Sequence, residues 1–340
     1  MKRDNCFDFL RFLFALNVVL GHMAAVTVFP ELTFLERICK TSLSVTGFFV
    51  ISGFLIAQSY EHSDLRSYLI KRARRLLPAY ILIVIVCAFG LVGMSTLSAH
   101  DYFHSSDLWK YLGANLCFLN FLHPSLPGVF EHPLLVNNAV NPSLWTLKIE
   151  IGFYLIVPLL IVWLNKSKRP WLVLLLIYVL AIIYRNGFNF YGDHTQQDIY
   201  FFLARQLPGA MSYFAVGMAA YKYKEKWLLY KNYLLLPALL IFILERYLCL
   251  DIFQPLAWGI VVLWCAYSLP HMNNFAKYGD ISYGIYIYHA PLLKLLVCVG
   301  LFTKIGIWPA TAIYVASVII AGFTSWHLLE NRFLKRKKIN

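Results

Sequence analysis

The sequence is poor in charged residues, and acidic residues are the scarcest of them. Asp, Glu, Lys and Arg make up 14% of the 340 residues, against about 25% in an ordinary soluble domain. Only 17 residues are acidic, 30 are basic, and 60% of the chain is hydrophobic. So little charge leaves no room for a sizeable soluble domain. It indicates a chain that crosses the membrane many times, because apolar runs of about 20 residues recur throughout it.

Other features that would point to different classes of protein are also missing. The seven cysteines show no CxxC or metal-ligand spacing and mostly lie in apolar runs, so we expect small core residues and no metal site. No convincing A-x-A cleavage site closes the first apolar run, which is therefore predicted to be a membrane helix. The net charge of +13 does not predict a nucleic-acid partner, because Lys and Arg lie in short loops that report topology.

Ten apolar runs predict an all-α, polytopic membrane protein with a single transmembrane domain over residues 1–340. The stretch at 109–123 is ambiguous because it is short and holds two asparagines. If it does not cross, nearly all basic loops fall on one side, so both termini are predicted to be cytoplasmic and 98–143 an outer, partly re-entrant segment. The predicted spans are 7–29, 43–60, 76–97, 144–164, 170–186, 199–221, 233–249, 252–269, 281–303 and 306–329.

The first apolar run carries three ionisable side chains, which are costly inside a membrane and mark functional sites by default. These are Asp8, Arg11 and His22. Eleven helical steps of about 100° leave Arg11 and His22 only about 20° apart, separated by about 16.5 Å along the axis. Asp8 shares the face of Arg11 and can pair with it. Snorkelling of Arg11, or a neutral structural role for His22, remains open, but together they suggest an anion held at the inner mouth and chemistry deeper in the membrane.

Two further stretches carry small or basic residues. The segment FFVISGFLI at 48–56 places Ser52 and Gly53 in mid-helix, where small residues let other chains approach closely. The segment KRARRLLP at 71–78 places Arg72 and Arg75 three residues apart, so that both can point at one phosphate group. The alternative for this segment is an ordinary positive loop that reports only topology.

Two more ionisable residues lie in apolar runs near the outer side. Glu150, in SLWTLKIEIGFYLIVP at 143–158, is predicted at the same depth as His22, about 10 Å below the outer surface at the helical rise per residue. His289, in GDISYGIYIYHAP at 279–291, is predicted near mid-membrane. Glu150 can then orient His22 and stabilise its imidazolium, as the acid of a catalytic triad does.

In this order, the motifs resemble the acyltransferase-3 family of membrane acyltransferases, which O-acetylate bacterial surface polysaccharides. Two departures, Lys148 and Ile151, put acceptor or acyl-group specificity in doubt rather than the reaction type. The chain resembles the stand-alone form, without a C-terminal hydrolase-like domain. The matching segments are Arg11 and His22 with ten residues between them, FFxxSGFL at 48–55, RxxR-L-x-P from Arg72 to Pro78, W-x-L-x-x-E-x-x-F-Y from Trp145 to Tyr154, ISYxxYxxH ending at His289, and W-x-L-L-E from Trp326 to Glu330.

The resemblance implies an O-acyltransferase of the bacterial inner membrane. Its donor substrate is acyl-CoA, with acetyl-CoA favoured and no permanently bound cofactor. Its acceptor is a hydroxyl of a surface or lipid-linked carbohydrate such as O-antigen or lipopolysaccharide. His22 then acts as general base or as a transient acyl carrier. The other roles are CoA-phosphate binding by Arg11, Arg72 and Arg75, passage of the donor arm past Ser52, orientation of His22 by Glu150, and support of either substrate by Asp8, Trp145 and His289.

Two functions from other classes explain part of the pattern. A secondary transporter of a small anionic solute accounts equally well for ten helices and intramembrane charges. However, the two halves show no matching pair of broken helices, and transport does not need the RxxR segment. A structural membrane module for a glycan-assembly complex needs neither the buried histidines nor the buried glutamate.

Overall fold

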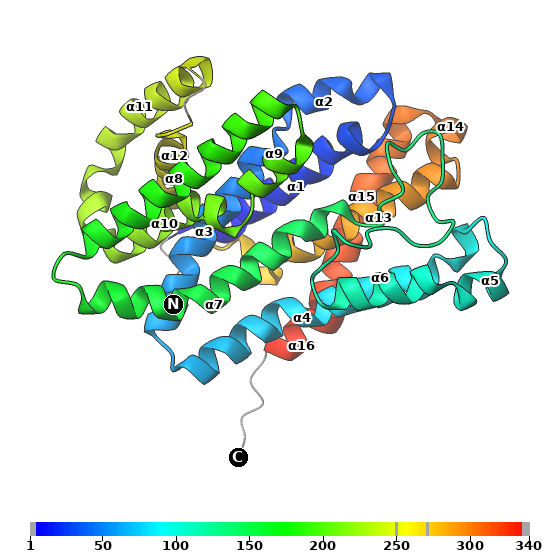
Figure 1. The fold of residues 1–340 in the computed structure, drawn as a ribbon, viewed down its shortest axis with the longest axis horizontal. Helices are drawn as coiled ribbons and strands as arrows, with labels where there is room; N and C mark the ends of the chain where they lie inside the picture. The colour runs from blue at the N-terminus through cyan, green and yellow to red at the C-terminus, as the bar shows by residue number, and fades with distance from the viewer. Residues whose placement is uncertain (1–4, 249–250, 270–271, 335–340) are drawn as a thin grey trace. The chain divides into compact units, whose positions relative to one another are not determined.

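The computed structural model describes residues 5–248, 251–269 and 272–334, and their regular secondary structure is helical (Figure 1). In these ranges the β pairing is limited to two isolated bridges, Thr27 with Leu135 and Ser95 with Val129. The predicted all-α fold is therefore confirmed. Both chain ends lie outside the described residues, so the side on which the termini lie stays a prediction.

The longer helices account for all of the predicted apolar runs. They are α1 (Phe7–Val26), α3 (Thr41–Glu61), α4 (Leu65–Gly90), α7 (Trp145–Lys166), α8 (Pro170–Thr195), α10 (Leu207–Lys222), α11 (Lys224–Leu248), α12 (Gln254–Ser268), α13 (Ser282–Cys298) and α15 (Ile307–Ser325). Shorter pieces connect them: η1 (Pro30–Leu32), α2 (Thr33–Ile38), η2 (Val92–Met94), α5 (Ala99–His104), α6 (Ser106–Leu116), η3 (Pro142–Leu144), α9 (Asp198–Ala204), η5 (Phe275–Tyr278), α14 (Leu301–Ile305), η6 (Trp326–Glu330) and α16 (Asn331–Leu334).

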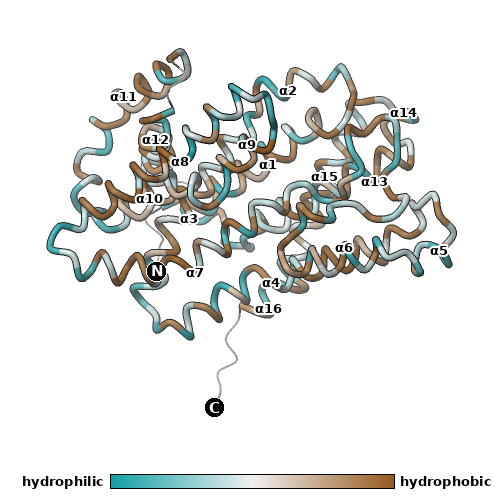
Figure 2. The backbone as a smooth tube through the Cα atoms, in the orientation of Figure 1, coloured by the Kyte–Doolittle hydropathy of each residue, from teal (hydrophilic) through white to brown (hydrophobic). Residues whose placement is uncertain are grey.

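The helices differ from the predicted runs mainly at their ends. Seven helical stretches in the described chain are long and apolar enough to cross a membrane, so the count of ten stays a prediction. The run at 199–221 is divided between α9 and α10. Helix α4 begins at Leu65, well before the run at 76–97, because its arginines and lysine are good helix formers although they are not apolar. Hydropathy marks the membrane rather than the helix; Figure 2 shows hydrophobic residues in brown and hydrophilic ones in teal.

The ambiguous stretch at 109–123 does not form a full-length crossing helix. Helix α6 has 11 residues, which rise about 16 Å, roughly half of a bilayer core. Two tyrosine hydroxyls hold α5 and α6 against α4. Tyr80 of α4 donates to the carbonyl of Asn115 (2.6 Å) and Tyr102 of α5 donates to that of Ala88 (2.7 Å).

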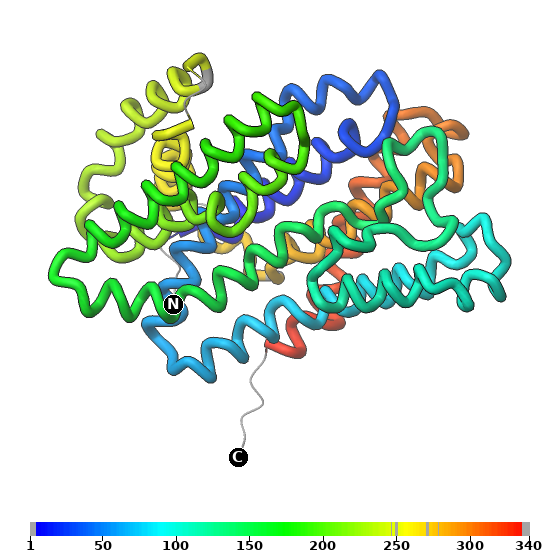
Figure 3. The backbone as a smooth tube through the Cα atoms, in the orientation of Figure 1, coloured from blue at the N-terminus to red at the C-terminus, as the bar shows by residue number. Residues whose placement is uncertain are grey.

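The chain divides into two compact units. Unit 1 comprises 1–10, 45–69 and 149–275, and unit 2 comprises 11–44, 70–148 and 276–340. In unit 1, α10 packs against α8 and α12, and α11 packs against α12; Figure 3 traces these segments from green to yellow. Gly53 of α3 lies so close to α10 that an added Cβ would collide with the backbone oxygen of Phe214. The close approach predicted at this glycine is therefore confirmed.

Unit 2 is organised around α13. Helix α15 packs against it through Gly284 and Gly322, whose backbones approach so closely that a Cβ on Gly284 would lie 2.8 Å from the Cα of Gly322. The short helix η3 also packs on α13. Because α13 is covered by several segments that are far apart in sequence, its polar residues find partners from all of them.

Candidate active site

Helices α1 and α13 make two polar contacts within unit 2, one near each end of their shared length. Arg11 pairs with Asp280, just before α13, and His22 contacts His289. Since both residue numbers increase from the first contact to the second, the two helices run parallel. A parallel course requires an odd number of membrane crossings between them, and the predicted topology with 109–123 outside provides that parity, because seven predicted runs lie between 7–29 and 281–303.

The two histidines form a hydrogen-bonded pair whose proton positions follow from their surroundings. His289 Nδ1 lies 2.7 Å from the carbonyl oxygen of Tyr286, which can only accept, so Nδ1 carries the hydrogen. In the neutral ring His289 Nε2 is then an acceptor, and His22 Nδ1, 2.8 Å away, is the donor. This assignment leaves the lone pair of His22 on Nε2. His289 is fully buried and His22 only partly so, which makes His22 the accessible member.

Ser143 completes this group. Its hydroxyl lies 3.1 Å from His289 Nε2 and 3.4 Å from His22 Nδ1. Pro291 helps to place Ser143, because proline has no N–H to bond the carbonyl of Ile287, four residues earlier. That carbonyl accepts instead from the Asn141 side chain at 2.8 Å. The segment that begins α7 is thereby fixed on α13 beside the histidines.

Lys294, five residues after His289 in α13, holds the loop that precedes η3. Its ammonium group is buried and donates to the carbonyl oxygens of Asn137 (2.7 Å) and Ala139 (2.6 Å). The same loop bonds to the end of α1 through the N–H of Val136 and the carbonyl of Val26 (3.0 Å). The loop before η3 is thus tied to both helices that carry the histidines.

The other end of the α1–α13 pair is a compact cluster of two arginines and two carboxylates. Asp280 Oδ2 accepts from Arg11 at 2.6 Å and from Arg75 at 2.5 Å. Arg75 also lies 3.7 Å from Glu330. The serine hydroxyl of Ser282 donates to the other oxygen of Asp280 at 2.5 Å. Burial alone raises the pKa of the Asp280 carboxyl, but the guanidinium groups and Ser282 outweigh it and hold that pKa below its ordinary value.

Aromatic rings and a glycine fix this cluster. The Arg75 guanidinium lies over the rings of Trp326 (5.5 Å) and Tyr283 (5.9 Å). Gly279, immediately before Asp280, has a φ of 129°, and an added Cβ would meet the Trp326 indole. Only glycine accommodates both that backbone conformation and that contact. Three of the motifs quoted from the sequence, RxxR, ISYxxYxxH and W-x-L-L-E, therefore meet here.

The phosphate-binding role predicted for Arg11, Arg72 and Arg75 stays a prediction. Arg72 and Arg75 are both half-buried on α4. However, Arg11 and Arg75 are engaged by carboxylates, which the sequence did not predict. The charges of the cluster balance, because two arginines face Asp280 and Glu330.

The predicted partnership of Glu150 with His22 stays a prediction, because the two residues belong to different units. Glu150 belongs to unit 1, where its carboxylate accepts from Tyr154 at 2.6 Å. His289 and Ser143, not a carboxylate, are the hydrogen-bond partners of His22 in unit 2. Asp8 and Ser52 also belong to unit 1, and Trp145 is the first residue of α7 in unit 2.

Ser143 and Asp280 were not predicted as site residues, although both lie in segments whose sequences predict a site. Ser143 stands at the start of SLWTLKIEIGFYLIVP and Asp280 near the start of GDISYGIYIYHAP. Each directly precedes a long apolar run, at the position where a polar residue ordinarily ends a loop. A polar residue beside a run that carries an intramembrane histidine or glutamate is the signal that could have found them.

Known proteins similar to this chain agree with the resemblance. The family profile for the acyltransferase domain of acyltransferase-3 matches residues 4–326. An O-acetyl transferase of Shigella phage Sf6 is 26% identical over 352 residues, which cover 99% of this chain and 98% of that protein. Nodulation protein 10 of Rhizobium leguminosarum bv. viciae is 25% identical over 358 residues, 97% of this chain and 93% of that protein.

A third relative is longer than this chain. Peptidoglycan O-acetyltransferase OatA of Listeria monocytogenes is 27% identical over 354 residues, which cover 88% of this chain but 52% of that protein. No solved structure shows a significant match. Because the family profile covers nearly the whole sequence, the chain belongs to the acyltransferase-3 family.

Proposed function

We propose that the chain is a membrane O-acyltransferase of the bacterial inner membrane that moves an acyl group, with acetyl favoured, from acyl-CoA to a carbohydrate hydroxyl. One observation carries this proposal: a partly accessible histidine, His22, whose Nε2 keeps its lone pair because buried His289 accepts the hydrogen of Nδ1. The names of two relatives, an O-acetyl transferase and a peptidoglycan O-acetyltransferase, support the same reaction and a glycan acceptor.

In the proposed reaction, His22 Nε2 takes the proton of the acceptor hydroxyl as the hydroxyl oxygen attacks the thioester carbon. The carbon–sulfur bond then breaks, and the CoA thiolate takes the proton from the imidazolium. An acyl group held transiently on Nε2 remains the alternative route to the same products. Both routes need the same free nitrogen, and the hydrogen bond from Nδ1 to His289 keeps it free.

His289 and Ser143 are positioning residues in this proposal. The positive charge that develops on His22 strengthens its Nδ1–H hydrogen bond to His289 Nε2, because hydrogen bonds from ionised donors are the stronger ones. Ser143 can accept a share of the same hydrogen. A neutral imidazole stabilises the imidazolium less than a carboxylate does. Its advantage is that it can be buried without the cost of burying an unpaired charge.

For the donor, we propose that Arg72, Arg75 and Arg11 bind the CoA phosphates. Guanidinium groups match phosphate geometry, and Arg72 and Arg75 share one face of α4. Arg11 and His22 are separated by about 16.5 Å along α1, a length comparable to an extended pantetheine arm. In the predicted topology the arginine end is cytoplasmic, so the acyl group reaches the outer part of the membrane without CoA crossing it.

The proposed function is tested by incubating purified protein with radiolabelled acetyl-CoA and an extracted surface glycan. We expect label to move to the glycan as an alkali-labile ester, because an O-acyl group is an ester. Retention of all label on CoA, together with uptake of an anionic solute by vesicles that carry the protein, would instead establish a transporter. Mass spectrometry of surface glycan from cells with and without the protein identifies the acceptor.

Replacing His289 separates positioning from general packing. We expect His289→Leu to lower kcat by about 10- to 100-fold with little change in KM for the donor, because His22 loses the acceptor for its Nδ1–H. His289→Gln should recover much of the loss, since its side-chain oxygen can accept the same hydrogen. The matched control is Tyr314→Phe, which removes a hydroxyl that bonds only the backbone carbonyl of His289 (3.2 Å). Equal activity of the Leu and Gln variants would contradict the role.

A further inference from the structure

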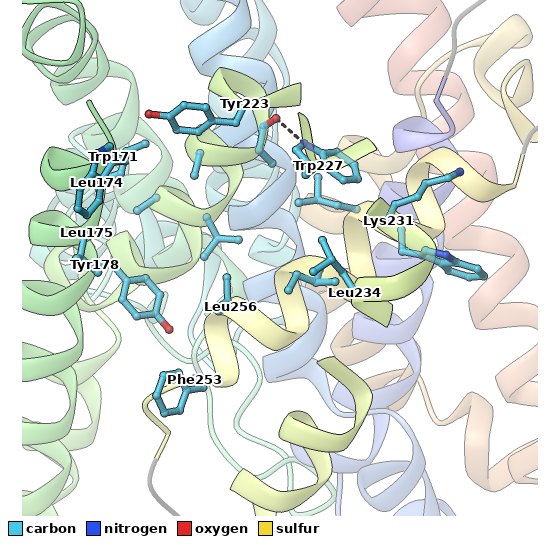
Figure 4. Close-up of a pocket in the computed structure, with 17 residues that line it drawn as sticks. Trp171, Leu174, Leu175, Tyr178, Tyr223, Trp227, Lys231, Leu234, Phe253 and Leu256 are labelled. Carbon is cyan, nitrogen blue, oxygen red and sulfur yellow. Dashed lines mark hydrogen bonds between the residues drawn. The ribbon is translucent and has the colours of Figure 1, made fainter. Parts of the chain in front are cut away.

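Unit 1 contains an apolar groove whose lining residues lie outside the motifs discussed above. It has a volume of about 630 Å³ and is lined by helices α8, α10, α11 and α12 (Figure 4). The part of its lining that comes from α10 includes three small residues, Ala215, Ala219 and Ala220. Because these side chains are short, they leave a trough beside the larger lining residues of α8 and α12. Such a trough suits a single alkyl chain.

Basic residues gather at one end of this groove. The lining residues Trp171 and Tyr223 lie next to the α7–α8 loop and the α10–α11 junction. These two connections meet, because Lys222 Nζ donates to the side chain of Asn165 at 2.7 Å. The cations carried by the two connections and the first turns of α11 are Lys166, Lys168, Arg169, Lys222, Lys224, Lys226 and Lys231.

Three of these lysines are fixed by contacts at or beside the lining residues of this end. Lys231, which lines the groove, donates to the carbonyl of Tyr267 (2.7 Å) and to the hydroxyl of Ser268 (3.0 Å), so one of its three N–H groups remains. Lys224 lies over the Tyr267 ring at 5.5 Å, and Lys226 over the Tyr223 ring at 5.8 Å. Among the described residues, Lys222 is the one of these cations that also pairs with an acid, Glu61.

The indoles near this end complete an amphipathic mouth. Trp227 lies in the groove with its ring N–H bonded to the carbonyl of Ala220 (2.8 Å), while Trp171 is 52% exposed. Tryptophan and tyrosine prefer the level of lipid headgroups, where one side is apolar and the other is wet. The opposite end holds Phe253 and Leu256 and no charge among the lining residues.

We propose that this groove binds an anionic glycerophospholipid, with one acyl chain in the trough and the phosphate at Lys224, Lys226 and Lys231. The apolar lining suits an alkyl chain, and the cations suit a phosphate with a further negative group. Basic pockets between transmembrane helices on the cytoplasmic side bind such headgroups, and the two basic loops lie on that side in the predicted topology. The site is independent of the acyl-transfer reaction.

The experiment uses the full chain in nanodiscs that contain phosphatidylglycerol with a diazirine near the middle of one acyl chain. After illumination, we expect labelled peptides from α10 and α12. Ala219→Trp should abolish the labelling because an indole fills the trough. Leu236→Trp is the matched control, because Leu236 is 64% exposed on α11 and does not line the groove.

A second pair of variants tests the headgroup without filling the groove. Lys224→Gln with Lys226→Gln should weaken binding of phosphatidylglycerol, measured by native mass spectrometry, by roughly 10- to 30-fold. Lys110→Gln with Lys304→Gln removes the same charge elsewhere and should leave binding unchanged. Equal binding of phosphatidylcholine would overturn the proposal. So would undecaprenyl phosphate that displaces phosphatidylglycerol when present at the lower concentration, or a dimer of the protein that Ala219→Trp dissociates.

Discussion

Replacing His22 by alanine is expected to lower the rate of acyl transfer by about 100- to 10,000-fold, the usual contribution of a general base. His22→Asn sharpens the test. Its amide N–H can still donate to His289 Nε2, as Nδ1 does, but nothing replaces the lone pair of Nε2. Both variants should therefore lose activity, and the asparagine variant should keep the wild-type thermal stability.

The control for this prediction is His100→Ala, which removes an exposed histidine of α5. Added imidazole should restore part of the activity of His22→Ala if the residue is a base. Acyl groups trapped on wild-type protein without acceptor, and absent from His22→Ala, would favour the covalent route. Near-normal turnover of a folded His22→Ala protein would remove this residue from the mechanism.

Asp280→Asn is expected to lower the free energy of unfolding by about 2–4 kcal/mol, because one carboxylate oxygen partners both Arg11 and Arg75. The side chains are 13–22% exposed, so the lower part of the range allows for solvent. The loss should also free guanidinium groups for the donor. We therefore expect acetyl-CoA to bind this variant more tightly, as measured by isothermal titration in detergent.

A double-mutant cycle isolates the interaction. Arg11→Gln combined with Asp280→Asn should cost less than the sum of the single changes, because Arg75 alone can still pair with Glu330. Additive losses would show that Arg11 and Asp280 act separately. Weaker acetyl-CoA binding in a stable Asp280→Asn protein would show that Asp280 assists donor binding rather than competing for the arginines.

The sequence carried enough information to predict the helices and the face shared by Arg11 and His22, because both follow from periodicity within one segment. The distribution of basic loops also favoured a stretch at 109–123 that does not cross, and the 11 residues of α6 agree with this; the side on which it lies stays a prediction. The predicted runs correspond to helices although several of these extend farther, as α4 does to Leu65.

The partners of these residues could not be predicted, because pairing between helices depends on their order and rotation. Glu150 was assigned to His22 from equal depth alone, and depth does not say which helices are neighbours. His289 and Asp280 contact α1 across more than 260 positions of sequence. Once α1 and α13 are known to be parallel neighbours, both contacts follow from helical rise.

Because α1 and α13 contact each other at two points, the ion cluster and the histidine pair, the number of residues between Arg11 and His22 cannot change without loss of one contact. One inserted residue would rotate one side chain by about 100° and shift it by about 1.5 Å relative to the other. Either the ion cluster or the histidine pair would then separate. Engineering of this enzyme should therefore keep that length fixed and place tags or insertions in exposed connections such as the one between α7 and α8.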